Sequence, residues 1–250
     1  MNAIAPLRHA VKSTFSAVSR WRVPIVEPTI IAELPHDPTA FTQGLAFHGN
    51  DLYESTGGEA NSSLRRLNSE DGRIHQKLPI DNDFAEGIAI VDQRLFQLSW
   101  KSGVAREFSI PDLRLVASHR YTGEGWGLAT RGRDLVSSDG SSRLRFWTPQ
   151  FRSLGSIRMR SNCVPIRWLN DLECVGNRVF ANVVDCPFVI EASLDDGQVA
   201  RLIDCRCLMK LASPLDSRQI LNGIAYRQES RTFYLTGKLW RSMFVVSMPL

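Results

Sequence analysis

Apolar and polar residues alternate along most of the chain in short segments. Clear examples are Arg94–Leu98, Arg178–Val183 and Arg231–Leu235. Alternation with a period of two residues is typical of strands with one buried face, whereas amphipathic helices repeat every 3.6 residues. Clusters of turn-forming residues, such as Leu194–Gly197, separate these segments about every ten residues. The pattern predicts an all-β fold built from many short strands.

One motif recurs five times and leads each time into an alternating segment with a turn. The five copies are Phe41–Ala46, Phe84–Ala89, Glu124–Ala129, Leu169–Glu173 and Leu221–Ala225. When they are aligned on their shared glycine, which is replaced by Asp171 in the fourth copy, successive copies lie 40 to 52 residues apart. A period of about 40–45 residues with several short strands per unit is typical of propeller blades. The sequence therefore predicts a five-bladed β-propeller over residues 29–250.

Two segments modify this simple repeat. Ile30–Leu34 is predicted to be a strand that precedes the first copy, and the long last interval predicts an insertion around Asp204–Arg218 that packs over one mouth of the channel. Residues 1–28 form a basic extension that carries +3 of the formal charge of +4. Basic residues interrupt its apolar stretch, which makes it a poor secretory signal, and a mobile tail is the simplest interpretation.

Charge and hydropathy narrow the classes of function. The propeller region is nearly neutral, so the sequence argues against a nucleic-acid-binding protein; we interpret Arg158, Arg160 and Arg167 as a solvated strand face. No apolar run approaches the ~18 residues of a membrane span. The five cysteines cannot all pair within one chain, and we expect buried free thiols, with Cys205 and Cys207 on one strand face. The odd number slightly favours a reducing, cytoplasmic location.

The residue before the repeat's glycine is expected to lie at one mouth of the central channel in every blade. These residues are Gln43, Glu86, Trp126, Asn170 and Asn222. Packing alone does not favour such a polar ring, so we interpret it as a site. Phe84 flanks Glu86, and we expect Trp100 and Phe41 nearby; a carboxyl group between aromatic side chains tends to have a raised pKa, which suits proton transfer near neutral pH.

Other catalytic motifs are missing from the sequence. There is no GxSxG nucleophile motif and no HExxH zinc motif, and the five histidines do not have metal-ligand spacing. Gly123-x-Gly125-x-Gly127 lacks the strand-to-helix context of a dinucleotide-binding loop, so we interpret it as a turn into the third blade.

Six motifs, in order along the chain, resemble the glutamine cyclotransferases, which are the glutaminyl-peptide cyclases of the plant and bacterial type. They are His36–Leu45, Phe84–Gly87, Gly125–Leu128, Leu169–Glu173, Leu221–Ala225 and Thr236–Trp240. The resemblance extends from about Ile30 to the end of the chain. It implies a five-bladed propeller, in agreement with the repeat count. It also implies an enzyme that converts the N-terminal glutamine of peptides or proteins to pyroglutamate and releases ammonia.

The same resemblance assigns expected roles to the candidate residues. Glu86 would move a proton from the α-amine to the leaving group, while Gln43, Trp126 and Asn170 would hold the carboxamide. Phe41, Phe84 and Trp100 would wall the pocket, Asn222 would complete the substrate-binding ring, and Lys238 would lie beside the site. The resemblance further implies a monomer that needs no catalytic metal or cofactor, and its bacterial members are often exported. Val184 stands where the family usually has tryptophan, which puts substrate affinity in question.

Two alternatives remain open at this point. In a calcium-dependent, lactonase-like propeller, Glu86, Asn170 and Asn222 would coordinate an axial Ca²⁺. A non-catalytic propeller that binds peptides would instead bind its ligand without turnover. Loss of activity on chelation would identify the first, and peptide binding without turnover the second.

Overall fold

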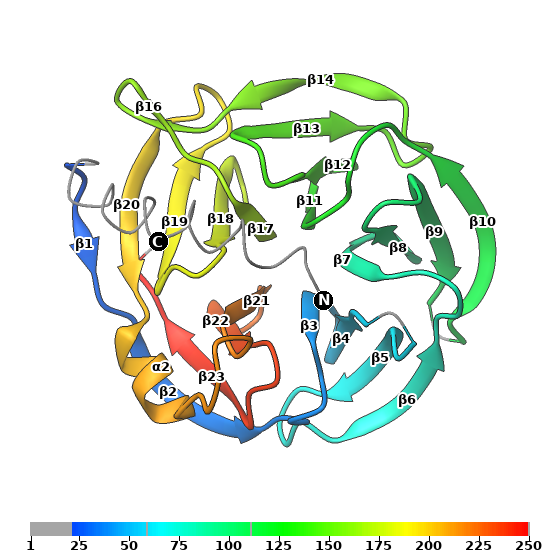
Figure 1. Ribbon diagram of the computed structural model, residues 1–250, viewed down its shortest axis with the longest axis horizontal. Coiled ribbons are helices and arrows are strands. Elements are labelled where there is room, and N and C mark those ends of the chain that lie inside the picture. Colours follow the sequence, from blue (N-terminus) through cyan, green and yellow to red (C-terminus); the bar gives the residue numbers. More distant parts are fainter. Residues whose placement is uncertain (1–21, 59, 111, 250) are drawn as a thin grey trace.

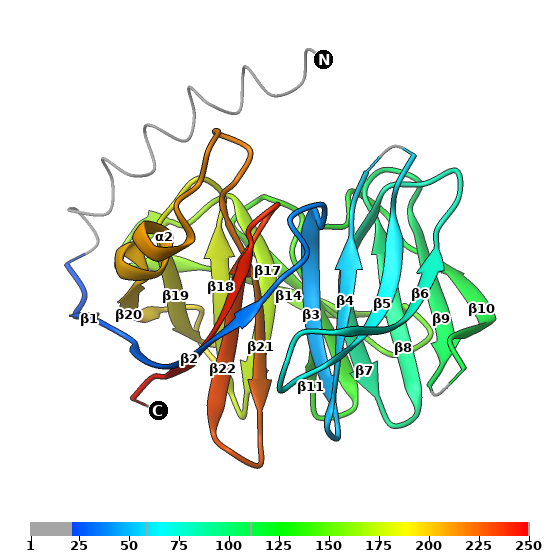
Figure 2. The same cartoon turned by 90° about the horizontal axis from the view of Figure 1, so that it is seen from below.

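The protein is a five-bladed β-propeller, as the repeat predicted, in a computed structural model that describes residues 22–249 apart from 59 and 111. Five sheets of antiparallel strands are arranged around a central axis (Figure 1). Seen from the side, the strands of each blade run between the two faces of the ring (Figure 2). The innermost strand of each blade contacts the innermost strands of both neighbouring blades, which closes the ring around the channel.

Each blade consists of four strands, numbered from the axis outward in the first four blades. Blade 1 contains β3 (Thr42–His48), β4 (Asp51–Thr56), β5 (Ser63–Asn68) and β6 (Ile74–Pro79). Blade 2 contains β7 (Ala85–Val91), β8 (Arg94–Ser99), β9 (Val104–Ser109) and β10 (Arg114–Arg120). Blade 3 contains β11 (Leu128–Arg131), β12 (Asp134–Ser137), β13 (Arg143–Trp147) and β14 (Ser153–Arg158). Blade 4 contains β17 (Leu169–Val175), β18 (Arg178–Val183), β19 (Phe188–Ser193) and β20 (Val199–Asp204).

Blade 5 is assembled from both ends of the described chain. Its three inner strands are β21 (Leu221–Arg227), β22 (Thr232–Gly237) and β23 (Ser242–Ser247). Its outermost strand is β2 (Thr29–Pro35), which pairs antiparallel with β23. The predicted strand at Ile30–Leu34 is therefore confirmed, and its pairing with the last strand holds the ring closed.

The hydrophobic core is divided among the five seams between neighbouring blades. Each seam has its own cluster of buried apolar side chains, for example Ala129 and Leu144 of blade 3 packed with Leu172 and Ile190 of blade 4. Inner strands such as β3 are buried on both faces, whereas the outermost strand β10 is largely exposed. Because the apolar area lies between blades, the free energy of folding depends on how closely the inner strands approach one another.

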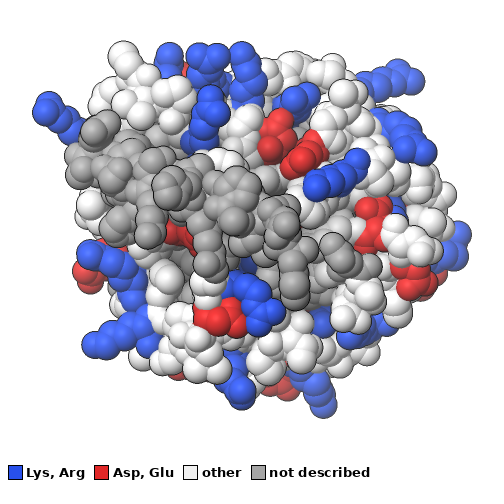
Figure 3. Space-filling view, viewed as in Figure 1, with Lys and Arg blue, Asp and Glu red and all other residues white. Residues whose placement is uncertain are grey.

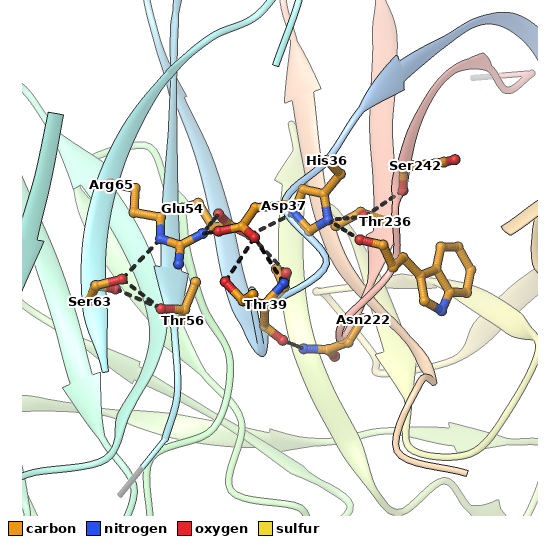
Figure 4. Close-up of polar contacts among 12 residues, drawn as sticks. His36, Asp37, Thr39, Glu54, Thr56, Ser63, Arg65, Asn222, Thr236 and Ser242 are labelled. Carbon is orange, nitrogen blue, oxygen red and sulfur yellow. Dashed lines mark hydrogen bonds and ion pairs between the residues drawn. The ribbon is translucent and has the colours of Figure 1, made fainter. Parts of the chain in front are cut away.

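A buried network of charged side chains joins blade 1 to blade 5 (Figure 4). His36, in the connection from β2 to β3, lies 2.8 Å from Glu54 of β4 through Nε2, and its Nδ1 lies 2.9 Å from the carbonyl oxygen of Trp240. Arg65 of β5 donates to Glu54 at 3.3 Å and to Asp37 at 3.0 Å. The network fixes the connection that leads to the first copy of the repeat.

Burial and charge act in opposite directions on this network. Burial opposes the charge on His36, but Glu54 outweighs it and raises the pKa of the imidazole above 6.5. Burial likewise opposes ionisation of Glu54, but His36 and Arg65 outweigh it and lower the pKa of the carboxyl below 4.5. Both shifts favour the ionised pair, which compensates the cost of removing two charges from water.

Other segments lie outside the blades. Within the basic extension, β1 (Ile25–Val26) pairs parallel with β20 at the outer edge of blade 4, while residues 1–21 lie outside the described residues. The two-residue strands β15 (Arg160–Ser161) and β16 (Val164–Pro165) form a small hairpin after blade 3.

The insertion after blade 4 differs from two predictions. It contains helix α2 (Arg206–Ala212), which lies at the rim near the outer strands of blades 4 and 5 rather than over the channel (Figure 1). Leu208 anchors the helix in the cluster between these blades. Cys205 precedes the helix and is buried, whereas Cys207 lies on the helix and is exposed, so the two thiols do not share a strand face.

Charged side chains are distributed around the rim of the face shown in Figure 3, where basic side chains have acidic ones between them. Arg158, Arg160 and Arg167 are all exposed, as a solvated surface requires. Among the residues that the structure describes, no helix is long and apolar enough to cross a membrane.

Candidate active site

A β-bulge in four of the five inner strands positions the ring of polar residues. The pairing register slips by one residue between Thr42 and Gly44 in β3 and between Ala85 and Ile88 in β7. The same slip occurs in β17 and β21. A bulge inserts an unpaired residue and redirects its side chain. The bulged residues include Gln43, Glu86, Asn170 and Asn222, so the repeat motif is the sequence signature of the bulge.

Glycine next to the bulge allows adjacent inner strands to approach closely. A Cβ atom on Gly87 would lie 2.6 Å from the carbonyl oxygen of Trp126, and one on Gly127 would lie 1.9 Å from the carbonyl oxygen of Asn170. The amide of Gly87 donates to the same oxygen of Trp126 at 2.6 Å. A side chain at either position would push neighbouring blades apart, so these glycines set the spacing of the site residues.

Glu86 is the central ionisable group of the site. Its side chain is only 5% exposed, and its Oε1 accepts a hydrogen bond from the Gln43 amide at 3.0 Å. Burial raises the pKa of Glu86 well above its usual 4.5; Lys238 opposes the rise, and the charges of Asp171 and Glu124 add to it. Desolvation therefore makes Glu86 a stronger base than an exposed carboxylate.

Lys238 lies in the turn between β22 and β23 and is 7% exposed. Its Nζ is 4.7 Å from the centroid of the Phe41 ring, in a cation–π arrangement. The turn is held to blade 1 because the amide of Leu239 donates to Ala40 at 2.7 Å. Burial lowers the pKa of Lys238 from 10.5 to about 8, against the opposing effect of Glu86 and other carboxylates. Burial therefore makes Lys238 easier to deprotonate than an exposed lysine.

Aromatic side chains form a partly exposed wall around these two groups. Phe84 makes edge-to-face contacts with Phe41, at a centroid distance of 6.2 Å, and with Trp100, at 5.5 Å. Trp126 continues the wall and lies 6.2 Å from Trp168 between centroids. The indole N–H of Trp126, which the sequence assigned to the carboxamide, donates instead to Glu124 at 3.0 Å. In this structure Trp126 therefore contributes a ring face.

The channel side of the site is rich in hydrogen-bond acceptors. Gln43 Oε1, Asn170 Oδ1, Asp171 Oδ1 and Asn222 Oδ1 are buried and have no hydrogen-bond partner within the described residues. A buried acceptor without a donor is costly, so this arrangement suits a ligand that brings several N–H groups. Asn222 also donates to the carbonyl oxygen of Thr42 at 2.9 Å, which joins blade 5 to blade 1.

Comparison with known proteins identifies the family. The family model for glutamine cyclotransferase matches residues 3–248. The chain belongs to the glutamine cyclotransferase family. The glutaminyl-peptide cyclotransferase of Arabidopsis thaliana is 36% identical over 230 residues, which cover 90% of this chain and 72% of that protein. The glutaminyl cyclase of Myxococcus xanthus has a crystal structure that aligns with a TM-score of 0.85 and 35% identity, over 90% of this chain and 97% of that one.

Three residues near the site were not singled out from the family motifs. Asp171 occupies the glycine position of the repeat and is fully buried. Its Oδ2 accepts a hydrogen bond from the amide of Ile224 at 2.9 Å. Its negative charge acts to raise the pKa of both Glu86 and Lys238. Glu124 accepts the indole N–H of Trp126. Trp168 lies beside Trp126, two residues before Asn170. The break in the repeat at position 171 was the only signal in the sequence for any of them.

Val184 stands at the position where the family resemblance predicts tryptophan. Val184 is buried, and its amide donates to the carbonyl oxygen of Trp168 at 3.0 Å. The backbone at Val184 is therefore joined to the connection that carries Trp168. In the described part of the chain, His, Cys, Asp and Glu side chains form no group of three or more that could hold a metal ion. Metal independence stays a prediction.

Proposed function

We propose that this chain is a glutaminyl-peptide cyclotransferase, which converts the N-terminal glutamine of peptides or proteins to pyroglutamate and releases ammonia. The main observation behind the proposal is the environment of Glu86. Its buried carboxyl group has a raised pKa, accepts a hydrogen bond from Gln43 and interacts electrostatically with Lys238. Membership of the glutamine cyclotransferase family and the similarity to two proteins named for this activity support the same conclusion.

The reaction needs positioning and proton transfer but no second substrate. The α-amine nitrogen attacks the carbonyl carbon of its own side-chain carboxamide, a new C–N bond closes the five-membered ring, and the bond to the amide nitrogen breaks. Holding the substrate in its cyclising conformation captures the advantage of an intramolecular reaction. The attacking amine must lose a proton, and the leaving nitrogen must gain one to depart as ammonia.

Glu86 is suited to carry that proton. An α-amine has a pKa near 7.7–8.0, and an ordinary carboxyl is too weak a base to exchange protons with it efficiently. Burial raises the pKa of Glu86, so the free energy needed to move a proton from the amine to this carboxylate is smaller than for an exposed carboxylate. Glu86 takes the proton from the attacking amine and delivers it to the leaving nitrogen. Lys238 tunes this balance, because its charge favours the anionic form of Glu86.

The remaining residues hold the substrate. The unpartnered oxygens of Gln43 and Asn170 accept N–H groups of the amine and the carboxamide, and the Asn170 amide stabilises the developing oxyanion. The rings of Phe41, Phe84 and Trp126 exclude water around the reacting atoms. All proton transfers are assigned to side chains of this chain, so we propose that the reaction is metal-free.

The test is ammonia release from a glutamine-initiated dipeptide amide, with and without a chelator. Glu86→Gln keeps the shape and removes proton exchange, so we expect kcat to fall by about 10²–10⁴. Glu70→Gln, the same substitution at an exposed carboxyl, serves as the control and should retain full activity. Chelation should leave the wild-type rate unchanged.

Each arm can contradict a different part of the proposal. Full activity of Glu86→Gln would exclude Glu86 as the proton carrier. Loss of activity on chelation would favour the calcium-dependent alternative. Absence of turnover in folded wild-type protein that still binds the peptide would point to a non-catalytic propeller.

A further inference from the structure

Glu124 connects two indole rings of the aromatic wall through one carboxylate oxygen atom. It lies in the connection between β10 and β11, and its side chain is exposed. Its Oε2 accepts the indole N–H of Trp100 at 3.0 Å and that of Trp126, also at 3.0 Å. Trp100 follows the last residue of β8 in blade 2, whereas Trp126 leads into blade 3. A single carboxylate therefore fixes two rings from different blades.

The backbone that carries Glu124 is firmly anchored. The amide of Gly125 donates to the carbonyl oxygen of Trp100 at 3.1 Å, and that of Trp126 donates to Ser138 at 3.1 Å. A Cβ atom on Gly125 would lie 2.7 Å from the carbonyl oxygen of Ser99, so the chain passes against blade 2 where only glycine fits. The backbone that follows Glu124 is therefore held in place by the fold.

The two indoles are also bordered through their rings. Trp100 is bordered by Phe84 and by Lys101, whose Nζ lies 3.8 Å from its ring centroid. Trp126 is bordered by Trp168 and by the backbone of Gly140, where a Cβ would lie 2.7 Å from the indole. Ring contacts of this kind tolerate sliding, whereas a hydrogen bond to a charged acceptor is directional and short. The N–H edge therefore defines the orientation of each ring.

We propose that Glu124 is a positioning residue, which holds the indoles of Trp100 and Trp126 so that their faces line the substrate pocket. This inference rests on the pocket proposed above. Glu124 accepts both N–H groups, so the wall that meets the substrate is apolar and the carboxamide takes its hydrogen bonds from the amide side chains. The negative charge of Glu124 also adds to the rise in the pKa of Glu86.

The first test compares Glu124→Ala with Glu124→Gln. Alanine removes the acceptor, so we expect KM for a glutamine dipeptide amide to rise by about tenfold or more, with kcat changed by less than about threefold. The glutamine carbonyl oxygen can still accept both indoles, so its KM should stay within about threefold of the wild-type value. Both substitutions remove a negative charge, so the acidic limb of the kcat/KM profile should move to lower pH. Glu70→Ala, at an exposed site, is the control.

The second test detects the hydrogen bonds directly and does not depend on turnover. The chain has six tryptophans, so a ¹⁵N-labelled sample gives at most six indole N–H cross-peaks. Glu124→Ala should shift two of them, identified by their loss in Trp100→Phe and in Trp126→Phe, while Glu124→Gln shifts them less. An inactive wild-type protein would leave this measurement intact, which separates failure of the inference from failure of the proposed function.

Three results would overturn the inference. The first is an unchanged KM and unchanged cross-peaks in Glu124→Ala, which would show that packing alone orients the rings. The second is a raised KM without the two shifts, which would mean that Glu124 acts by touching the peptide. The third applies if Glu124→Ala does not fold: Glu124→Leu fills a similar volume without an acceptor, and a wild-type KM with unshifted cross-peaks in that variant would then contradict the inference.

Discussion

The buried charge of Lys238 should make the wild-type protein less stable than a variant that lacks it. Burial lowers the pKa of Lys238 from 10.5 to about 8. A tenfold change in proton affinity corresponds to about 1.4 kcal/mol, so the charged folded form is disfavoured by about 3 kcal/mol relative to the unfolded chain. Lys238→Met removes the charge and keeps an unbranched apolar side chain. We expect it to raise the free energy of unfolding at pH 7 by about 1–3 kcal/mol.

The pH dependence gives this prediction a definite sign. Because the unfolded chain binds the lysine proton more tightly than the folded protein does, wild-type stability should rise as the pH increases from about 8 to 10.5. Below pH 8 both states are protonated and the full cost is present. The stability difference between Lys238→Met and the wild type should therefore be largest below pH 8 and shrink toward pH 10.5. Glu86 loses its neighbouring cation in the variant, so its pKa rises further and ammonia release falls.

The assay is urea unfolding at several pH values, together with ammonia release. Lys77→Met is the matched control, because Lys77 is exposed on the outermost strand of blade 1 and its loss should change stability by less than about 0.5 kcal/mol. If Lys238→Met is less stable than the wild type at pH 7 while Lys77→Met is unchanged, the nearby carboxylates outweigh burial. The site would then not be electrostatically strained, and the argument for Lys238 would fail.

Two further predictions concern the seams between blades. Gly127→Ala places a Cβ 1.9 Å from a backbone oxygen of the next blade, so it should lower the free energy of unfolding in urea by at least about 2–3 kcal/mol and reduce ammonia release. Gly132→Ala is the control: Gly132 has a φ of +61° but open space around it, so the substitution should cost about 1 kcal/mol. Equal costs in the two variants would contradict the close approach at Gly127. Glu54→Gln should cost about 3–5 kcal/mol, against less than about 1 kcal/mol for Glu107→Gln in a more exposed pair. The stability that the His36 pair contributes to the wild type should be fully present below pH 6.5 and should decline as the pH rises through the raised pKa of His36. Measurements of stability against pH should show no such decline in Glu54→Gln. If the decline persisted in that variant, ionisation of His36 would be excluded as its cause.

The sequence was sufficient to predict the blades because the repeat records a local backbone feature. A polar residue followed by glycine marks a bulge beside a close approach of two strands, as Gln43-Gly44 and Glu86-Gly87 show. The bulge and the close approach each depend on residues that are adjacent in the sequence. Because both features recur in successive blades, the residues that form them repeat along the sequence at a regular interval. The polar ring, including Asn170 and Asn222, followed from the same period.

Residues whose roles depend on other blades could not be predicted in this way. Asp171 replaces the repeat's glycine, and its carboxylate matters because Ile224 of the next blade supplies an amide. Glu124 gains its role from Trp100, 24 residues away, through a geometry that the motif does not contain. The position of α2 likewise depends on the apolar cluster that Leu208 enters, and not on the length of the insertion.

The proposed active site spans the seam at which the propeller ring closes. Gln43 and Phe41 come from the start of blade 1, whereas Lys238 belongs to blade 5, so their spacing depends on how these two blades meet. Apolar packing tolerates small sliding movements, but the network of His36, Glu54 and other charged groups has directional hydrogen bonds on both sides of the seam. Removing charges from water is costly, and well-packed apolar residues could give similar stability. The geometry of the proposed site gives such a network a role that apolar packing lacks. It fixes the distance between Glu86, whose partner Gln43 belongs to blade 1, and Lys238 of blade 5.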